Sequence, residues 1–194
     1  MSLARTRERR GFAYIWAMVT IAVLAAIIAA AAPYLYSTGD ATRMATTATE
    51  LRAIGVAVNT FEQTEARKFP GKISYLDIAI TTTSANSCWA TNAFSGADVT
   101  TWSNNAPYIT TYLPTGGIWT PIGLIRDSIP SRSTNHSDSI WLELPGVSAE
   151  DARLLDITID GTADSTKDTV RFHVPVNDTT TIRFRVTPRE LNRC

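Results

Sequence analysis

The hydrophobic positions of the chain follow two different patterns in its first third. From Phe12 to Tyr36 the sequence reads FAYIWAMVTIAVLAAIIAAAAPYLY, without one Asp, Glu, Lys, Arg or His. At about 1.5 Å of rise per helical residue, such a stretch is long enough for the roughly 30 Å hydrocarbon core of a bilayer. Arginines crowd its N-terminal flank but not its C-terminal flank, so the positive-inside rule predicts a cytoplasmic N-terminus. Residues 12–36 are therefore a predicted transmembrane helix.

Two other interpretations of this segment stay open at this stage. A cleavable secretory signal has a shorter apolar region, about 7 to 15 residues, followed by small residues. The alanine run at residues 29–32 imitates such a cleavage site. The second interpretation is an uncleaved signal anchor that holds a periplasmic domain.

An amphipathic pattern follows Tyr36, with apolar positions at intervals of three and four residues. The stripe consists of Met44, Thr47, Ala48, Leu51, Ile54, Val58 and Phe61. This period predicts a single helix from about Phe12 to Glu65, apolar in its first half and amphipathic in its second. Phe69-Pro70-Gly71 should stop it, because proline cannot continue the hydrogen-bond ladder and glycine turns the chain.

The rest of the chain has a β character in its last forty residues. Residues 72–135 are rich in Thr, Ser, Asn, Gly and Pro, which predicts short strands and long loops. Ser139–Leu144 is a predicted strand that ends in a Pro145-Gly146 turn. Ser148 is a predicted N-cap of a short helix that continues to about Leu155.

Three later segments alternate polar and apolar residues, namely Asp156–Asp160, Thr169–Val174 and Thr180–Val186. They predict three antiparallel strands in a meander. One face of this sheet needs an apolar cover, and the amphipathic half of the long helix offers the matching stripe. The predicted fold class is α+β, with a long N-terminal helix packed on a C-terminal antiparallel sheet.

Charge and cysteine content narrow the class of protein. The chain is neutral overall, and residues 1–11 hold four arginines against one glutamate, so the remainder is mildly acidic and nucleic-acid binding is not indicated. In an oxidising extracytoplasmic compartment Cys88 and Cys194 are expected to form a disulfide. Two unpaired thiols are the alternative. A metal site at the cysteines is disfavoured, because neither His136 nor His173 stands at ligand spacing from a cysteine.

Aspartates recur every four residues from Asp156 onward, and three of them, Asp160, Asp164 and Asp168, fall among the oxygen donors of the segment DGTADSTKD. Calcium prefers such donors, so these three residues are a weak calcium candidate. The spacing is not that of an EF-hand, and ordinary turns use the same residue types. No motif of a hydrolase, nucleotide-binding loop or metalloprotease occurs, so we expect neither catalysis nor a cofactor.

Taken in order, these features resemble a bacterial type IV pilin or a type II secretion pseudopilin. The shared features are an arginine-rich leader that ends at Gly11, a following Phe12, the apolar and amphipathic helix, and the C-terminal sheet. Pro33 stands twenty-second counted from Phe12, where the family commonly carries a helix-bending proline. The FPG at residues 69–71 is similar to the aromatic-proline-glycine that often follows the first pilin helix.

The resemblance implies a non-enzymatic filament subunit divided into four parts. They are a leader peptide (1–11), a transmembrane and filament-core helix (12–36), its amphipathic continuation (37–66) and a globular head (67–194). Prepilin peptidase would cleave between Gly11 and Phe12 and methylate the new amine. The implied partners are the inner membrane before assembly, the inner-membrane assembly machinery, and then copies of the chain or other pilins in an extracytoplasmic filament, with the head periplasmic until assembly.

Trp16 departs from the family pattern. The fifth mature residue is normally a glutamate, thought to pair with the N-terminal amine of a neighbouring subunit. An unpaired amine in an apolar core is costly. Either the chain is a minor, tip-located pseudopilin, or it is a divergent major subunit in which the indole fills the gap. An uncleaved, signal-anchored periplasmic enzyme or binding domain is the rival from another class.

Overall fold

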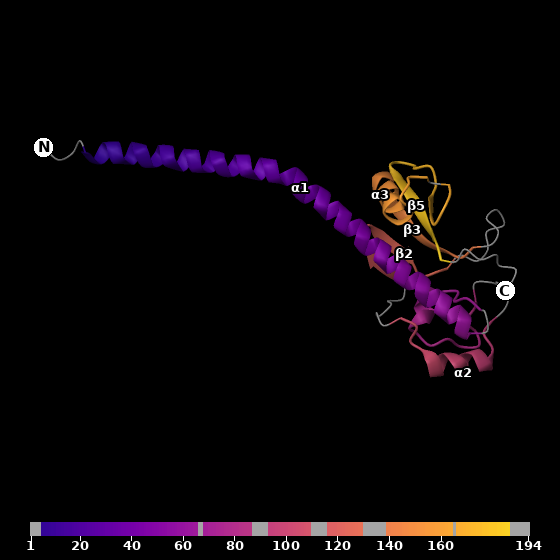
Figure 1. The fold of residues 1–194 in the computed structure, drawn as a ribbon. Helices are drawn as coiled ribbons and strands as arrows, with labels where there is room; N and C mark the ends of the chain where they lie inside the picture. The colour runs from indigo at the N-terminus through magenta and orange to yellow at the C-terminus, as the bar shows by residue number, and fades with distance from the viewer. Residues whose placement is uncertain are drawn as a thin grey trace. The chain divides into compact units, whose positions relative to one another are not determined.

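The computed structural model describes residues 5–65, 68–86, 93–109, 116–129, 139–164 and 166–186, and for residues 5–16 and 30–37 it describes the backbone alone. The chain divides into two compact units, Met1–Thr42 and Arg43–Cys194. The described elements, coloured along the chain in Figure 1, are α1 (Arg5–Thr64), η1 (Ile73–Leu76), α2 (Gly96–Asn105), β1 (Gly117–Thr120), β2 (Gly123–Arg126), β3 (Trp141–Ser148), α3 (Ala149–Asp160), β4 (Val170–Phe172) and β5 (Thr179–Arg185). The fold class is therefore α+β, with two antiparallel sheets.

The helix α1 begins at Arg5 rather than at Phe12, and it ends at Thr64, one position before the predicted end. The earlier start agrees with the residue types around it, because Arg and Glu are good helix formers. In the second unit the predicted apolar stripe is confirmed. Its members are all buried, namely Met44, Thr47, Ala48, Leu51, Ile54, Val58 and Phe61.

This stripe packs directly on the three-stranded sheet. At Gly55 the helix lies close to the sheet, since a Cβ there would be in ordinary contact with Cε1 of Phe184 in β5, at 3.6 Å. Four residues later, Asn59 Nδ2 donates to the carbonyl of Val186, at 3.3 Å. Leu142, Val170, Ile182 and Phe184 from the sheet join the same buried core. These contacts confirm the predicted packing of the amphipathic residues 44–61 on the sheet.

The strand composition of that sheet differs from the prediction. Residues 156–160, predicted as a strand, form the end of α3. The Ser148 side chain accepts from the N–H of Asp151 and starts the helix, as expected. The helix then continues to Gly161, whose left-handed conformation at φ 80° closes it. Ala152, Leu155 and Asp156 are buried at helical spacing, which the short alternation of DITID had concealed.

The predicted meander is confirmed only in part. Its strands Thr169–Val174 and Thr180–Val186 correspond to β4 and β5, which pair antiparallel, but the strand order is β3-β5-β4 with β5 in the centre. The third strand comes from β3, which continues through the predicted turn at Pro145-Gly146. The register shifts between Leu144 and Val147, so this dipeptide sits in a β-bulge. A bulge tolerates the missing N–H of proline, whereas a regular ladder position does not.

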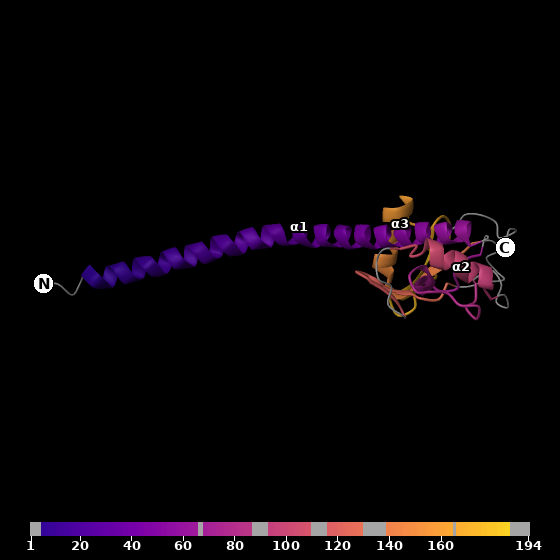
Figure 2. The ribbon, with the colours of Figure 1, turned by 90° about the horizontal axis from the view of Figure 1, so that it is seen from below.

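The remaining elements complete the head. The hairpin of β1 and β2 lies beside β3, where Gly123 faces the Val147 side chain. Figures 1 and 2 place α2 and α3 at separate ends of this unit. In the FPG segment Gly71 is needed for space, since a Cβ there would lie 2.3 Å from the carbonyl oxygen of Ala85. This segment follows the end of α1, as the sequence predicts.

Candidate functional site

The most distinctive surface belongs to the first unit, on α1. Every described side chain from Ala17 to Ala29 is exposed. Its large apolar members are between 50% and 67% exposed, namely Met18, Val19, Ile21, Val23, Leu24, Ile27 and Ile28. Successive helical residues point about 100° apart, since there are about 3.6 residues per turn. These seven positions therefore fall on all sides of the helix, and no side has a polar face.

Such a surface is unusual for a helix that remains in water. A helix that is hydrophobic all round is ordinarily buried in a large core or in lipid, and large exposed apolar areas mark sites of association. Within the described residues, no helix has an apolar stretch of the length required to cross a membrane. The predicted span 12–36 also includes residues for which the backbone alone is described.

The predicted processing residues lie in the same helix. Gly11 and Phe12 both belong to α1. Glycine in a helix costs about 1 kcal/mol relative to alanine, so Gly11 weakens the helix locally at the bond between Gly11 and Phe12. A local unwinding is what a peptidase needs to reach a backbone carbonyl. The assembly residues Trp16 and Pro33 also lie in α1, with their side chains outside the described part.

Two other predicted sites have different outcomes. Cys88 and Cys194 lie outside the described residues, so their disulfide stays a prediction. The weak calcium candidates are described, and the oxygens of two of them, Asp160 and Asp164, accept hydrogen bonds from the chain itself. Asp160 Oδ2 accepts from the N–H groups of Thr169 and Val170, at 2.9 and 2.8 Å. Among the described residues no cluster of His, Cys, Asp or Glu is suited to hold a metal ion.

Asp164 likewise supports its own loop. Its Oδ1 accepts from the N–H of Thr166 at 3.0 Å and from the Thr166 hydroxyl at 2.7 Å. These bonds lower the pKa of Asp164, with a further contribution from Lys167. The carboxylate is thus held ionised as part of a turn. Asp168 adopts a left-handed conformation, with φ 63°.

Asp156, where the four-residue spacing of aspartates begins, is a polar group whose burial the sequence did not predict. It lies inside α3, is 1% exposed, and neither carboxylate oxygen has a hydrogen-bond partner in the described structure. Burial raises its pKa to about 6. The backbone N–H of Asp164 opposes this shift, and the neighbouring carboxylates of Asp160 and Asp164 add to it. Its charged form is therefore unfavourable in the fold.

A second polar cluster lies where α1 ends. Glu65 is buried, and its Oε1 accepts from the Tyr108 hydroxyl at 2.7 Å. The Thr64 hydroxyl donates to the same tyrosine oxygen at 3.1 Å. Burial raises the pKa of Glu65 and, together with the bond to Glu65, raises the pKa of Tyr108 to about 12. These bonds tie the last turn of α1 to the segment after α2.

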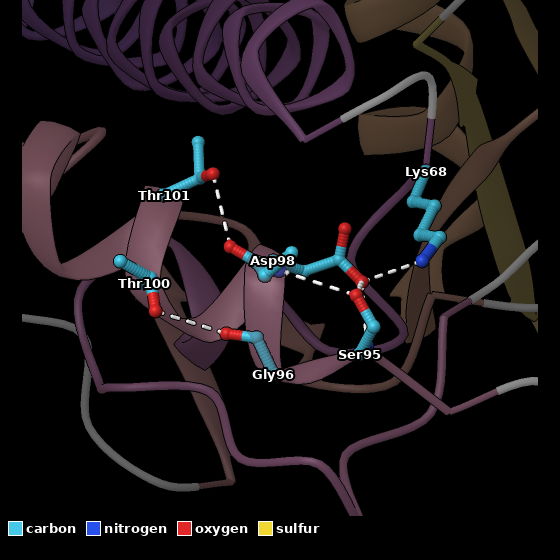
Figure 3. A network of polar contacts seen from close by, with 7 residues as sticks. Lys68, Ser95, Gly96, Asp98, Thr100 and Thr101 are labelled. Carbon is cyan, nitrogen blue, oxygen red and sulfur yellow. Dashed lines mark hydrogen bonds and ion pairs between the residues drawn. The ribbon is translucent and has the colours of Figure 1, made fainter.

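Next to it, Lys68 forms an ion pair with Asp98, the third residue of α2 (Figure 3). Asp98 Oδ2 also accepts from the N–H of Ser95 and from the Ser95 hydroxyl, the latter at 2.6 Å. Burial favours the neutral carboxyl, but the bonds from Lys68 and Ser95 outweigh it, so the pKa of Asp98 is lowered. Sequence reasoning missed this cluster, although the Ser95-x-x-Asp98 spacing is a capping-box signal.

Comparisons with known proteins find no protein similar to this chain. No family model, curated protein or solved structure matches this chain. The interpretation of the exposed segment of α1 and of the head depends on the residues and contacts described above.

Proposed function

We propose that the chain is a structural subunit of a bacterial type IV pilus-like filament with a pilin-like fold. Prepilin peptidase removes residues 1–11 by cleavage after Gly11, and the apolar part of α1 then forms the filament core. The head, in which residues 44–61 of α1 pack on the antiparallel sheet, faces outward. The subunit carries out no catalysis and needs no cofactor.

One observation carries this proposal, namely the apolar surface around α1 between Ala17 and Ala29. An all-apolar rod is stable in lipid or against other apolar rods, and the small alanine side chains permit close helix approach. The same residues can thus serve as an inner-membrane anchor first and as a polymerisation surface afterwards. Copies of this chain or other pilins are the partners, with peptidase and assembly machinery in the inner membrane.

The structure of the head is consistent with a subunit in which the apolar segment polymerises and the head stays folded by itself. Its core contains none of the apolar segment, since the part of α1 that joins the core is the buried stripe within residues 44–61. The buried ties of Glu65 and Asp98 fix the end of the helix within the head. Such a head is suited to remain folded in the periplasm before assembly and on the filament surface afterwards.

Trp16 favours a second candidate, a minor or tip pseudopilin of a type II secretion system. A subunit at the tip has no neighbour above it that presents an N-terminal amine, so it can lack the usual glutamate. The proportion of this chain in sheared filaments distinguishes the two roles. A bulk component is a major subunit, and a trace component is a minor one.

The intact mass of the protein from the membrane and filament fractions tests the proposal. Loss of residues 1–11, with one added methyl group, is the expected result. Gly11→Val should retain the leader, because the peptidase site is blocked by a branched side chain. Gly39→Val is the matched control, since Gly39 is also in α1 and a Cβ there meets nothing within 4 Å. A wild-type protein that keeps its leader in both fractions is an uncleaved anchor, and the proposal fails.

A further inference from the structure

The outward face of the three-stranded sheet carries an arginine cluster. In the strand register, Arg183 of β5 stands between Glu143 of β3 and Arg171 of β4. One row further along, Arg185 is opposite Trp141. The alternate residues on these strands face the core and are buried. Glu143, Arg183 and Arg171 therefore lie on the face of the sheet that points away from α1. Trp141 and Arg185, two residues further along their strands, lie on the same face.

The charges on this face do not balance. Arg183 Nε donates to Glu143 Oε1 at 3.0 Å, and Arg126 Nη1 lies 3.6 Å from Glu143 Oε2. One carboxylate is thus shared by two guanidinium groups. Among the described residues, neither Arg171 nor Arg185 takes part in an ion pair. The face has an excess of positive charge.

Arg171 reaches across the central strand. Its guanidinium carbon lies 5.0 Å from the centre of the Trp141 ring, although β4 and β3 are separated by β5. The cation–π contact holds the guanidinium in place over the indole. The Arg171 backbone is directly opposite Arg183, a pairing of like charges that destabilises a sheet when no anion is present.

Both partners of this contact have a buried donor without an acceptor. Neither Arg171 Nε nor Trp141 Nε1 has a hydrogen-bond partner in the described structure. Trp141 is only 8% exposed, so the missing acceptor leaves a desolvated donor, which is costly. Buried N–H groups are nearly always satisfied in folded proteins, and an orphan pair calls for an explanation. An oxyanion would supply acceptor oxygens and also neutralise the opposed arginines.

We propose that this face, around Arg171 and Trp141, is a binding site for a carboxylate group. The planar guanidinium matches the geometry of a carboxylate, and a charge-assisted bond is stronger than a neutral one. The carboxylate comes from a small free anion or from an acidic side chain of a second copy of the chain. The site is independent of the function proposed above, because it uses neither the leader nor the apolar segment.

Citrate titration of the full-length protein, ¹⁵N-labelled and monodisperse in a non-ionic detergent, tests the site by NMR. The Trp141 indole N–H and the Arg171 Nε–H are the direct reporters. Both resonances should shift with a saturable dependence on citrate, against sodium chloride of equal ionic strength. The indole of Trp119, which is 76% exposed on β1, is the control and should follow the chloride series. Absence of saturation at both reporters overturns the proposal.

Matched substitutions separate the site from general charge effects. Arg171→Gln should weaken citrate binding roughly ten- to a hundredfold, because a bond to a charged group is lost. Arg153→Gln is the control, since Arg153 is exposed on α3 and pairs with Glu150; it should bind citrate like the wild type. Backbone resonances of the core establish that each variant is folded. If Arg171→Gln does not fold, Arg171→Lys takes its place, because lysine lacks the planar guanidinium and its Nε–H. Wild-type affinity in the folded Arg171 variant overturns the proposal.

Sedimentation of the same samples distinguishes the two sources of the carboxylate. If a second copy supplies it, citrate should dissociate self-associated protein and Arg171→Gln should lower self-association. If a small anion supplies it, citrate should bind without a change in association state. The leader mass decides the filament proposal separately, so the two can fail independently.

Discussion

Asp156→Asn should stabilise the head at pH 8 and leave it nearly unchanged at pH 4. The aspartate is 1% exposed without a hydrogen-bond partner in the described structure, and its pKa in the fold is raised from 3.8 to about 6. One pKa unit corresponds to about 1.4 kcal/mol. The shift therefore amounts to about 3 kcal/mol of unfavourable free energy once the carboxyl is ionised.

The direction of the change in stability with pH follows from how many protons the folded and unfolded chains bind. Between about pH 4 and pH 6 the folded chain holds a proton on Asp156 that the unfolded chain has released, so the contribution of this group to stability falls as pH rises. Above the folded pKa the loss is complete. Asparagine has nearly the same shape and no charge, so the variant should be more stable by up to about 3 kcal/mol at pH 8.

Urea unfolding of the full-length protein in a non-ionic detergent, followed by near-ultraviolet circular dichroism at pH 4 and pH 8, measures this difference. Asp168→Asn is the control, because Asp168 is an exposed residue of the loop that follows α3 and asparagine also tolerates its left-handed backbone. The change in unfolding free energy for Asp168→Asn at each pH is the reference with which the Asp156→Asn change is compared. An Asp156→Asn effect that is the same at pH 4 and pH 8, or a loss of stability at pH 8, refutes the reasoning.

Three further substitutions test the core, the cap and the exposed segment. Leu51→Ala, in the buried stripe of α1, should lower the free energy of unfolding by about 2–5 kcal/mol in the urea assay. Val56→Ala, on the exposed side of the same helix, should change the free energy of unfolding by no more than about 0.5 kcal/mol. Ser95→Ala removes the cap of α2 and should cost about 1–2 kcal/mol by thermal unfolding, with no loss refuting the capping role. Ile28→Asp places a charge in the apolar segment at roughly 3 kcal/mol per subunit, so it should abolish filaments seen by electron microscopy after leader removal; Val174→Asp, at an exposed position before β5, should not.

The amphipathic part of α1 was predictable because its pattern is redundant. Seven positions over five turns repeat the same period, and each is buried against one surface. The segment Asp156–Asp160 has no such redundancy, since five residues fit both periods. The cap at Ser148 and the closing Gly161 decide for the helix. The order of strands was beyond the sequence, because the pairing of β3 with β5 is a long-range contact that local alternation does not encode.

The polar clusters were less predictable for a related reason. Lys68 and Asp98 are thirty positions apart, and their meeting depends on how the chain returns from η1 to α2. The capping box within α2 was nevertheless visible in the sequence. Arg171 and Trp141 meet only because the register of three strands brings them to one face. Neither residue type nor spacing indicates such a contact beforehand.

The apolar side chains in the two parts of α1 differ in what covers them, and this difference predicts how the head and the filament depend on protein concentration. The buried stripe within residues 44–61 is covered by the core of the same chain, so its burial stabilises the head at any protein concentration. The side chains from Ala17 to Ala29 have no cover from the described residues. If copies of the chain cover them, as proposed above, their burial follows mass action. Head stability should therefore be independent of concentration, while sequestration of the apolar segment should depend on it. A denaturation midpoint of the head that rises with protein concentration would contradict this separation.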